Sequence, residues 1–244
     1  QYLFRPGSGV PASVSCDALA AHVSLFCLVP AHSLGLMRLA ACALLLVIMS
    51  GWRPQLTAPL HWWISWSFYV SARTADGGDQ VAAVLTLIML PIALADTRKW
   101  VWQAAAPARS ALRNTVALAC LFLLQIQIAV IYFDASIEKP RLAEWADGTN
   151  MYYILSNNIF GAPHYLSSLM SAITTTPAVA LLTWSVLCLE FVLGIALLLP
   201  PWARRIALYV GLLFHVGIAL FLGITTFGII MMGALFIGIT PAGW

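Results

Sequence analysis

The chain contains several apolar segments, each about as long as a membrane-spanning helix. A helix needs about 20 apolar residues to cross a bilayer, and fewer where it packs among other helices. About seven segments meet this criterion, and they comprise residues 33–50, 60–72, 81–95, 115–133, 177–199, 206–221 and 225–239. The pattern predicts an all-α fold, a polytopic transmembrane helical bundle. The segment 60–72 is short and rich in aromatic residues, so it is either a span or an interfacial or re-entrant piece.

The composition supports this class and excludes others. Of the 244 residues, 61% are hydrophobic and 9% are charged, whereas an average soluble domain has about 25% charged residues. A water-soluble fold and a disordered chain are both excluded. The net charge of +3 is spread along the chain without a basic patch, so we expect a lipid bilayer as partner and no nucleic acid.

The chain reads as one membrane domain, because residues 1–244 contain no internal repeat and no low-complexity linker. It begins at Gln1 without the profile of a signal peptide. We therefore expect one more membrane helix before Gln1.

Basic residues predict the orientation of the helices. Lys and Arg concentrate in the loops 96–113 and 200–205, and short cytoplasmic loops are enriched in these residues. We expect both loops to be cytoplasmic. The segment 1–30 and the loop 135–176 then lie outside, and Cys16 and Cys27 fall in this oxidising compartment. They are either joined by a disulfide or left as two free thiols.

The richest candidate site follows the helix 115–133. Gln125 and Tyr132 are seven residues apart and so share one helix face. Beyond them lie charged and aromatic residues, namely Lys139, Glu144, Trp145, Asp147, Tyr152 and Tyr153. An amine at the membrane boundary is a candidate base, with Tyr132, Glu144 and Asp147 as further catalytic candidates. The alternative is an interfacial belt of snorkelling and aromatic residues.

A second candidate is the intramembrane pair Glu190 and His215. Each lies ten residues from the joint 200–205, so in an antiparallel hairpin both sit about 15 Å deep. A carboxylate at that depth normally faces a partner or a cavity. The pair is either a structural hydrogen bond or a proton-handling or ligand site.

A third candidate is the outer joint that contains Arg73, Asp76 and Asp79. Two carboxylates beside a glycine pair offer oxygen ligands to a hard cation, but the other ligands that calcium requires are missing. A tight turn followed by an Asp cap on a helix beginning at Gln80 explains the same residues. We therefore expect no metal.

Several motifs resemble known membrane proteins. The run YFDASIEKPRLAEWADGTNMYYIL at residues 132–155 resembles the signature of the HTTM domain, which vitamin K-dependent γ-carboxylases share with many bacterial proteins. Residues 24–30, 50–68, 76–91, 96–102 and 214–235 are similar to the bacterial sporulation-delaying protein B (SdpB) family. They read SLFCLVP, SGWRPQLTAPLHWWISWSF, DGGDQVAAVLTLIMLP, DTRKWVW and FHVGIALFLGITTFGIIMMGAL.

The resemblance implies a multi-pass protein of the bacterial cytoplasmic membrane. Proteins of the SdpB family are needed, with a small SdpA-like partner, for maturation or export of a secreted, bacteriocin-like peptide toxin from its precursor. In the carboxylases the signature lysine is the base that deprotonates vitamin K hydroquinone, and Lys139 stands at that position. The alternatives are therefore a quinone-dependent oxidoreductase or carboxylase-like enzyme, with an isoprenoid quinone as cofactor, and a non-catalytic membrane scaffold.

Overall fold

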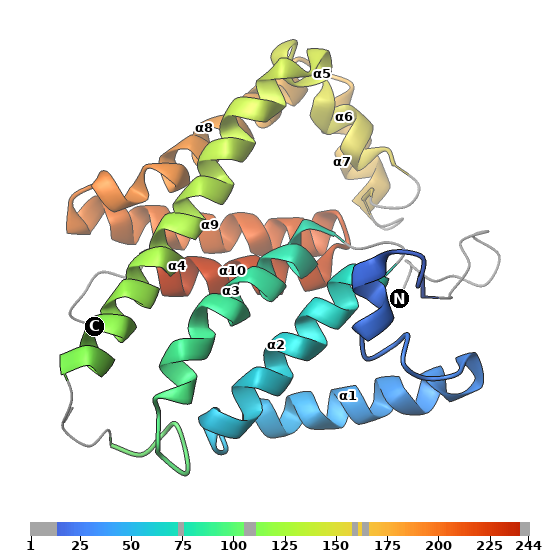
Figure 1. The fold of residues 1–244 in the computed structure, drawn as a ribbon. Helices are drawn as coiled ribbons and strands as arrows, with labels where there is room; N and C mark the ends of the chain where they lie inside the picture. Colours follow the sequence, from blue (N-terminus) through green and yellow to red (C-terminus); the bar gives the residue numbers. More distant parts are fainter. Residues whose placement is uncertain (1–13, 73–75, 105–110, 158–160, 163–165, 240–244) are drawn as a thin grey trace. The chain divides into compact units, whose positions relative to one another are not determined.

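The computed structural model describes residues 14–72, 76–104, 111–157, 161–162 and 166–239 (Figure 1). These residues form α-helices and short 3-10 helices, with no strand beyond an isolated bridge between Trp52 and Trp100. The all-α prediction is confirmed. Four helices are long and apolar enough to cross a membrane, and two shorter helices are also apolar. The four comprise Ala31–Met49, Gly77–Leu94, Ala111–Arg141 and Pro201–Phe221, and the two comprise Ala178–Gly194 and Thr225–Ile239. The chain is a multi-pass helical membrane protein.

The chain divides into two compact units, one of residues 9–124 and one of residues 1–8 with 125–244. The first unit contains η1 (Leu19–Val23), η2 (Ala31–Ser33), α1 (Leu34–Met49), α2 (Pro54–Ser71) and α3 (Gly77–Leu94). Helix α4 (Ala111–Glu138) runs from the first unit into the second. The second unit continues with η3 (Lys139–Arg141), α5 (Ala143–Ala146), α6 (Asn150–Leu155), α7 (Ser167–Thr174), α8 (Ala178–Gly194), η5 (Ala196–Leu198), α9 (Pro201–Phe221) and α10 (Thr225–Ile239).

The α2–α3 hairpin is the centre of the first unit (Figure 1). Helix α2 starts at Pro54, six residues before the predicted segment 60–72, because proline is favoured in a first helical turn, where its missing N–H costs nothing. At one end of this hairpin, the backbone N–H of Arg53 donates to the carbonyl of Lys99 over 2.8 Å. At the other end, the backbone N–H of Leu25 donates to the hydroxyl of Ser67 over 2.9 Å.

The segment before α1 contains a disulfide between Cys16 and Cys27, with the Cα atoms 5.8 Å apart. Of the two alternatives left by the sequence, the structure contains the bonded one. The disulfide closes the segment that carries Val23, whose carbonyl accepts a 3.2 Å hydrogen bond from the indole N–H of Trp63 on α2.

The Gly-rich joint before α3 is a helix cap. One carboxylate oxygen of Asp76 accepts from the backbone N–H groups of Gly78 and Asp79, and the Asp79 carboxylate accepts from the backbone N–H of Asp76 over 3.0 Å. This reciprocal arrangement satisfies backbone donors that the first helical turn leaves free. The interpretation as a turn and cap is confirmed, but the helix starts at Gly77 rather than Gln80, because Asp76 and not Asp79 is the capping residue. Arg73 lies outside the described residues.

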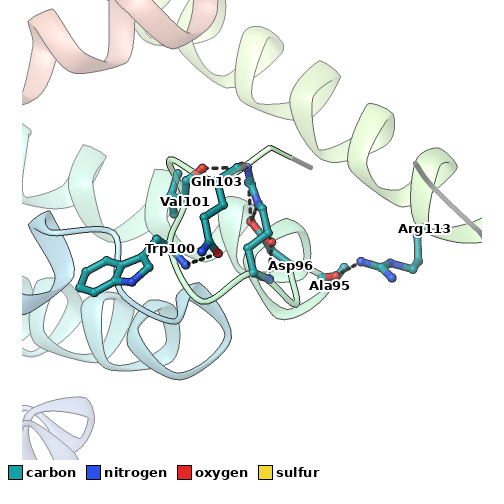
Figure 2. A network of polar contacts seen from close by, with 7 residues as sticks. Ala95, Asp96, Trp100, Val101, Gln103 and Arg113 are labelled. Atoms are coloured by element: carbon teal, nitrogen blue, oxygen red, sulfur yellow. Dashed lines mark hydrogen bonds and ion pairs between the residues drawn. The ribbon is translucent and has the colours of Figure 1, made fainter. Parts of the chain in front are cut away.

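The guanidinium group of Arg98 binds three residues of the loop after α3, and Figure 2 labels these partners as Asp96, Val101 and Gln103. Arg98 binds Asp96 through a 2.6 Å ion pair and donates to the carbonyls of Val101 and Gln103. The side-chain hydrogen bond from Arg98 keeps the pKa of the Asp96 carboxyl below its usual range. Arg113, at the start of α4, donates to the carbonyl of Ala95. The described part of the predicted loop 96–113, residues 96–104, is therefore a turn fixed by side-chain contacts.

Two predicted loops are partly helical. Helix α4 continues past residue 133 to Glu138, and the region predicted as the loop 135–176 contains η3, α5, α6 and α7. Arg204 and Arg205, placed by the sequence in the joint 200–205, belong to the first turns of α9. The helix starts at Pro201 because proline again suits the first helical position.

Glycines allow close helix packing in the second unit. A Cβ atom at Gly194 of α8 would lie 2.8 Å from the backbone nitrogen of Phe133 on α4, and one at Gly238 of α10 would lie 2.6 Å from the side chain of Ile128. Small residues at such crossings let helix backbones approach where no hydrophobic effect drives them together. Helix α4 thus contacts both α8 and α10.

Candidate functional site

Lys139 and Glu190 form an ion pair at the end of α4. Lys139 follows the last residue of α4, and its ammonium contacts Oε1 of Glu190 on α8. The two side chains differ in exposure, with 29% of Lys139 and 7% of Glu190 accessible to solvent. The ammonium also lies 5.0 Å from the ring centroid of Trp145, in range of a cation–π interaction. The Lys139 amine is thus held between a buried carboxylate and an indole.

The segment after Lys139 folds back onto α8, the helix that carries Glu190. Gly148 has a positive φ of 85°, and a Cβ atom there would lie 2.7 Å from that of Ala180 on α8. Only glycine fits this combination of backbone angle and close approach. The backbone N–H of Met151 then donates to the hydroxyl of Thr183, also on α8, over 3.2 Å. These contacts bring the buried Trp145 under the ammonium.

A second pair, Tyr132 and His215, lies two helical turns before Lys139. The hydroxyl of Tyr132 and Nε2 of His215 on α9 are 2.7 Å apart, and both side chains are buried, with exposures of 2% and 1%. Phe214 and Phe227 place their rings 5.1 and 5.7 Å from the His215 ring. Tyr132 and Lys139 are seven residues apart, so the geometry of α4 brings both to similar angular positions.

The two pairs belong to one polar cluster. Tyr132 lies seven residues before Lys139, so the two pairs follow one another at the end of α4. Within the described part of the chain, Oε2 of Glu190 and Nδ1 of His215 are buried and have no hydrogen-bond partner. Buried polar atoms are nearly always bonded to protein or water, so these two atoms mark places where a further group belongs.

Of the two alternatives for Glu190 and His215, the hydrogen bond between them is wrong. Glu190 instead forms an ion pair with Lys139, and His215 forms a hydrogen bond with Tyr132. An isolated α8–α9 hairpin offers the two side chains only each other, whereas Tyr132 of α4 and Lys139 directly after α4 supply a partner to each of them. The expectation that a carboxylate inside the bundle faces a partner is met.

The remaining predicted residues lie away from this cluster. Glu144 is exposed, and Gln125 is half-buried one helical repeat before Tyr132. Tyr152 and Tyr153 are exposed and pack edge to face, with ring centroids 5.4 Å apart.

Asp147, Asp76 and Asp79 each accept hydrogen bonds from backbone N–H groups within three residues of themselves. Asp147 accepts hydrogen bonds from the hydroxyl and the backbone N–H of Thr149, and these lower the pKa of the Asp147 carboxyl. Asp76 and Asp79 belong to the other unit and cap α3.

The chemistry open to the cluster is proton transfer and hydrogen bonding. An ammonium, a carboxylate, a phenol and an imidazole are the groups that proteins use as general acids and bases. Among the described residues, no group of three or more His, Cys, Asp or Glu side chains is placed to hold a metal ion. An apolar groove of about 320 Å³ lies between α8 and α9, and it includes Cys188 and Trp202 but no member of the cluster.

Sequence reasoning found all four members of the cluster but not their pairing. Thr183, which anchors the segment that brings Trp145 to the cluster, was missed. A hydroxyl inside an apolar helix, where it needs a partner, is the signal that could have identified it.

Comparison with known proteins places the chain in a family. The HTTM domain matches residues 18–244. The chain is 36% identical over 242 residues to the uncharacterized protein YitO of Bacillus subtilis (strain 168), covering 98% of this chain and 77% of that protein. It is 35% identical over 219 residues to the sporulation-delaying protein SdpB of the same organism, covering 88% of this chain and 68% of that protein. No solved structure matches the chain. The chain belongs to the HTTM-domain family, in the group that includes the sporulation-delaying protein SdpB.

Proposed function

We propose that this protein is an SdpB-like membrane component that matures or exports a secreted peptide toxin, together with a small SdpA-like partner. The observation that carries the proposal is the similarity to the sporulation-delaying protein SdpB along most of both chains. The proposed place of action is the bacterial cytoplasmic membrane. The test is deletion of the gene in its native host, which should leave the toxin precursor unprocessed or inside the cell. Normal secretion of active toxin from the deleted strain would refute the proposal.

We infer the orientation from the two ends of the α2–α3 hairpin. Basic residues gather at the end where Arg53 meets Lys99, and the disulfide lies at the end where Leu25 meets Ser67. Cytoplasmic loops are enriched in Lys and Arg, and disulfides persist in oxidising compartments. Both rules favour the same orientation, in which the loop 96–113 and the start of α9 are cytoplasmic and residues 135–176 are outside.

Single-cysteine labelling tests this orientation. The free cysteines Cys42, Cys120 and Cys188 are replaced first, and one new cysteine is then introduced at position 104 or 157. An impermeant maleimide added to intact cells should label position 157 and spare position 104, which should react only after the cells are opened. Labelling of both positions from outside would refute the orientation.

We propose the Lys139–Glu190 cluster as the functional site of this protein. Its support is the ion pair with the buried Glu190 carboxylate, together with the resemblance of the run around Lys139 to the HTTM signature. Lys139→Ala should abolish precursor processing, while Arg141→Ala, a change of the neighbouring exposed cation, should not. Full processing by a Lys139→Ala variant that reaches the membrane at normal level would refute a catalytic role and favour the scaffold alternative.

A second candidate is a quinone-dependent oxidoreductase or carboxylase-like enzyme in which Lys139 is the base. The two buried atoms without partners, Oε2 of Glu190 and Nδ1 of His215, favour it, because a polar head group with donor and acceptor atoms fits them. A bound quinone would supply redox chemistry, and Glu190 and His215 would hold its head group. Solvent extraction of the purified protein separates the candidates, since a stoichiometric isoprenoid quinone is expected only for the second.

A further inference from the structure

The apolar groove between α8 and α9 contains no member of the polar cluster. It has a volume of about 320 Å³ and is lined by residues of both helices, among them Cys188 and Val192 of α8 and Ala203 and Ile206 of α9. None of the described residues that line it carries a charge. Because an apolar wall offers no partner to a polar group, the groove suits a hydrocarbon chain.

The length and position of the groove match one acyl chain of a lipid. Leu199 and Trp202 line it where α8 and α9 are joined, and Val210 lines it further along α9. From Trp202 to Val210 the helix rises about 12 Å, while the hydrocarbon of one leaflet is about 15 Å deep. Trp202 is 67% exposed, and tryptophan concentrates at the membrane boundary. The groove therefore runs from this boundary into one leaflet.

Positive charge lies at the boundary end of the groove. Arg204 and Arg205 directly follow Ala203 in the first turns of α9. Arg204 is half-buried, and its Nε is buried without a hydrogen-bond partner. Helices α9 and α10 contain no acidic residue, and the one on α8, Glu190, is paired with Lys139. Since buried N–H donors nearly always have a partner, the Arg204 guanidinium marks a place for an anion from outside this hairpin.

The start of α9 attracts an anion to the same end. Helix α9 begins at Pro201, and among the described residues no side chain caps its first turn, which also contains no acidic residue. The first N–H groups of a helix have no partner within the helix and carry the positive end of its dipole. Phosphate groups bind at such helix starts. The helix start and Arg204 thus favour the same kind of group.

We propose that the α8–α9 groove and Arg204 form a binding site for one anionic phospholipid. One acyl chain lies in the groove, and the phosphate lies at Arg204 and the start of α9. Basic residues beside a groove between membrane helices are typical of sites for acidic head groups. A neutral isoprenoid fills the groove but leaves Arg204 without an anion, and a zwitterionic lipid also brings a cation to it. The site is separate from the proposed role in toxin maturation.

The test uses a cysteine that lines the groove. Cys188 and Cys42 are both exposed free thiols, but Cys42 belongs to α1 in the other unit. The full chain is delipidated in a neutral detergent and treated with N-ethylmaleimide, and the labelling rate of each cysteine is measured by peptide mass spectrometry. Added dioleoylphosphatidylglycerol should slow the labelling of Cys188. Its concentration for half the rate should be about tenfold below that of dioleoylphosphatidylcholine, as expected for one charge-assisted hydrogen bond. Labelling of Cys42 should respond equally to both lipids.

Variants locate the source of the preference. Arg204→Gln should remove the tenfold difference between the two lipids, and Arg204→Lys, which keeps the charge, should retain most of it. Arg53→Gln, a change of an exposed cation in the other unit, should leave it intact. An unchanged preference in Arg204→Gln would overturn the proposal.

The comparison of ligands on the unchanged protein decides the question without any variant. Equal half-rate concentrations for the two lipids would overturn the proposal. Protection of Cys188 by menaquinone at lower concentrations than by phosphatidylglycerol would also overturn it, because the occupant would then be a neutral isoprenoid. Inorganic phosphate, which has the charge but no acyl chain, should not protect Cys188. The experiment needs neither toxin nor partner, so it can succeed or fail independently of the proposed function.

Discussion

Removal of Lys139 should destabilise the protein more than removal of the charge on Glu190. The Lys139→Met variant leaves a carboxylate whose side chain is 7% exposed and whose Oε2 already lacks a partner. Breaking a buried ion pair from one side leaves an uncompensated charge in a medium of low polarity. We expect a loss of about 3 kcal/mol in the free energy of unfolding, the lower end of the values for such pairs.

The opposite change should cost less. In Glu190→Gln the remaining charge is on Lys139, whose side chain is 29% exposed and can reach water and the indole of Trp145. The glutamine amide oxygen still accepts a hydrogen bond, so we expect a loss of about 1 kcal/mol. The double variant Lys139→Met with Glu190→Gln buries no charge. It should therefore be more stable than Lys139→Met alone.

The assay is equilibrium unfolding of the purified protein in mixed micelles, with helicity followed against the mole fraction of denaturing detergent. Arg141→Met is the matched control, because Arg141 and Glu138 form an exposed ion pair with side-chain exposures of 67% and 49%. Such pairs contribute about 0.5 kcal/mol or less. Equal losses for Lys139→Met and Glu190→Gln, or a double variant less stable than either, would refute the reasoning from unequal burial.

Three further predictions concern packing, the disulfide and pH. Gly194→Ala should lower the free energy of unfolding by about 1–3 kcal/mol, since its Cβ would meet the backbone of α4 at 2.8 Å, whereas Gly233→Ala, with nothing within 4 Å, should be tolerated in the same assay. Cys16 and Cys27 should react with maleimide only after reduction, and their replacement by serine should cost about 2–3 kcal/mol. The pKa of Asp96 is lowered in the folded state. The ionised carboxylate therefore contributes fully to the stability of the loop above the ordinary carboxyl pKa of about 3.9, and this contribution is lost as the pH falls through the lowered value. Protection of the loop 96–103 from hydrogen exchange, corrected for the pH dependence of the intrinsic rate, should therefore hold from neutral pH to about pH 5 and fall only below about pH 4, while Asp96→Asn should lower this protection already at neutral pH.

The sequence predicted the helices well because long apolar segments permit no other membrane structure. All seven apolar segments contain an observed helix, and the segment 225–239 begins at the residue where α10 begins. The ends of the others were misjudged where polar residues continue a helix, as at Asp134–Glu138 in α4 and in the first turn of α2. Apolar character marks the part of a helix that meets lipid, whereas backbone hydrogen bonds and caps decide where the helix stops.

The site was harder to predict because it depends on which helices touch. Glu190 and His215 lie equally far from the joint 200–205, so any antiparallel hairpin places them at the same depth in the membrane. Their depth could not reveal that α4 lies against α8 and α10, since these contacts depend on small residues such as Gly194 and Gly238. Tyr132 of α4 then meets His215, and Lys139, which follows the last residue of α4, meets Glu190. A buried polar residue in a membrane helix therefore indicates that a partner exists, and a nearby glycine, such as Gly194 four residues after Glu190, indicates that another helix lies close by.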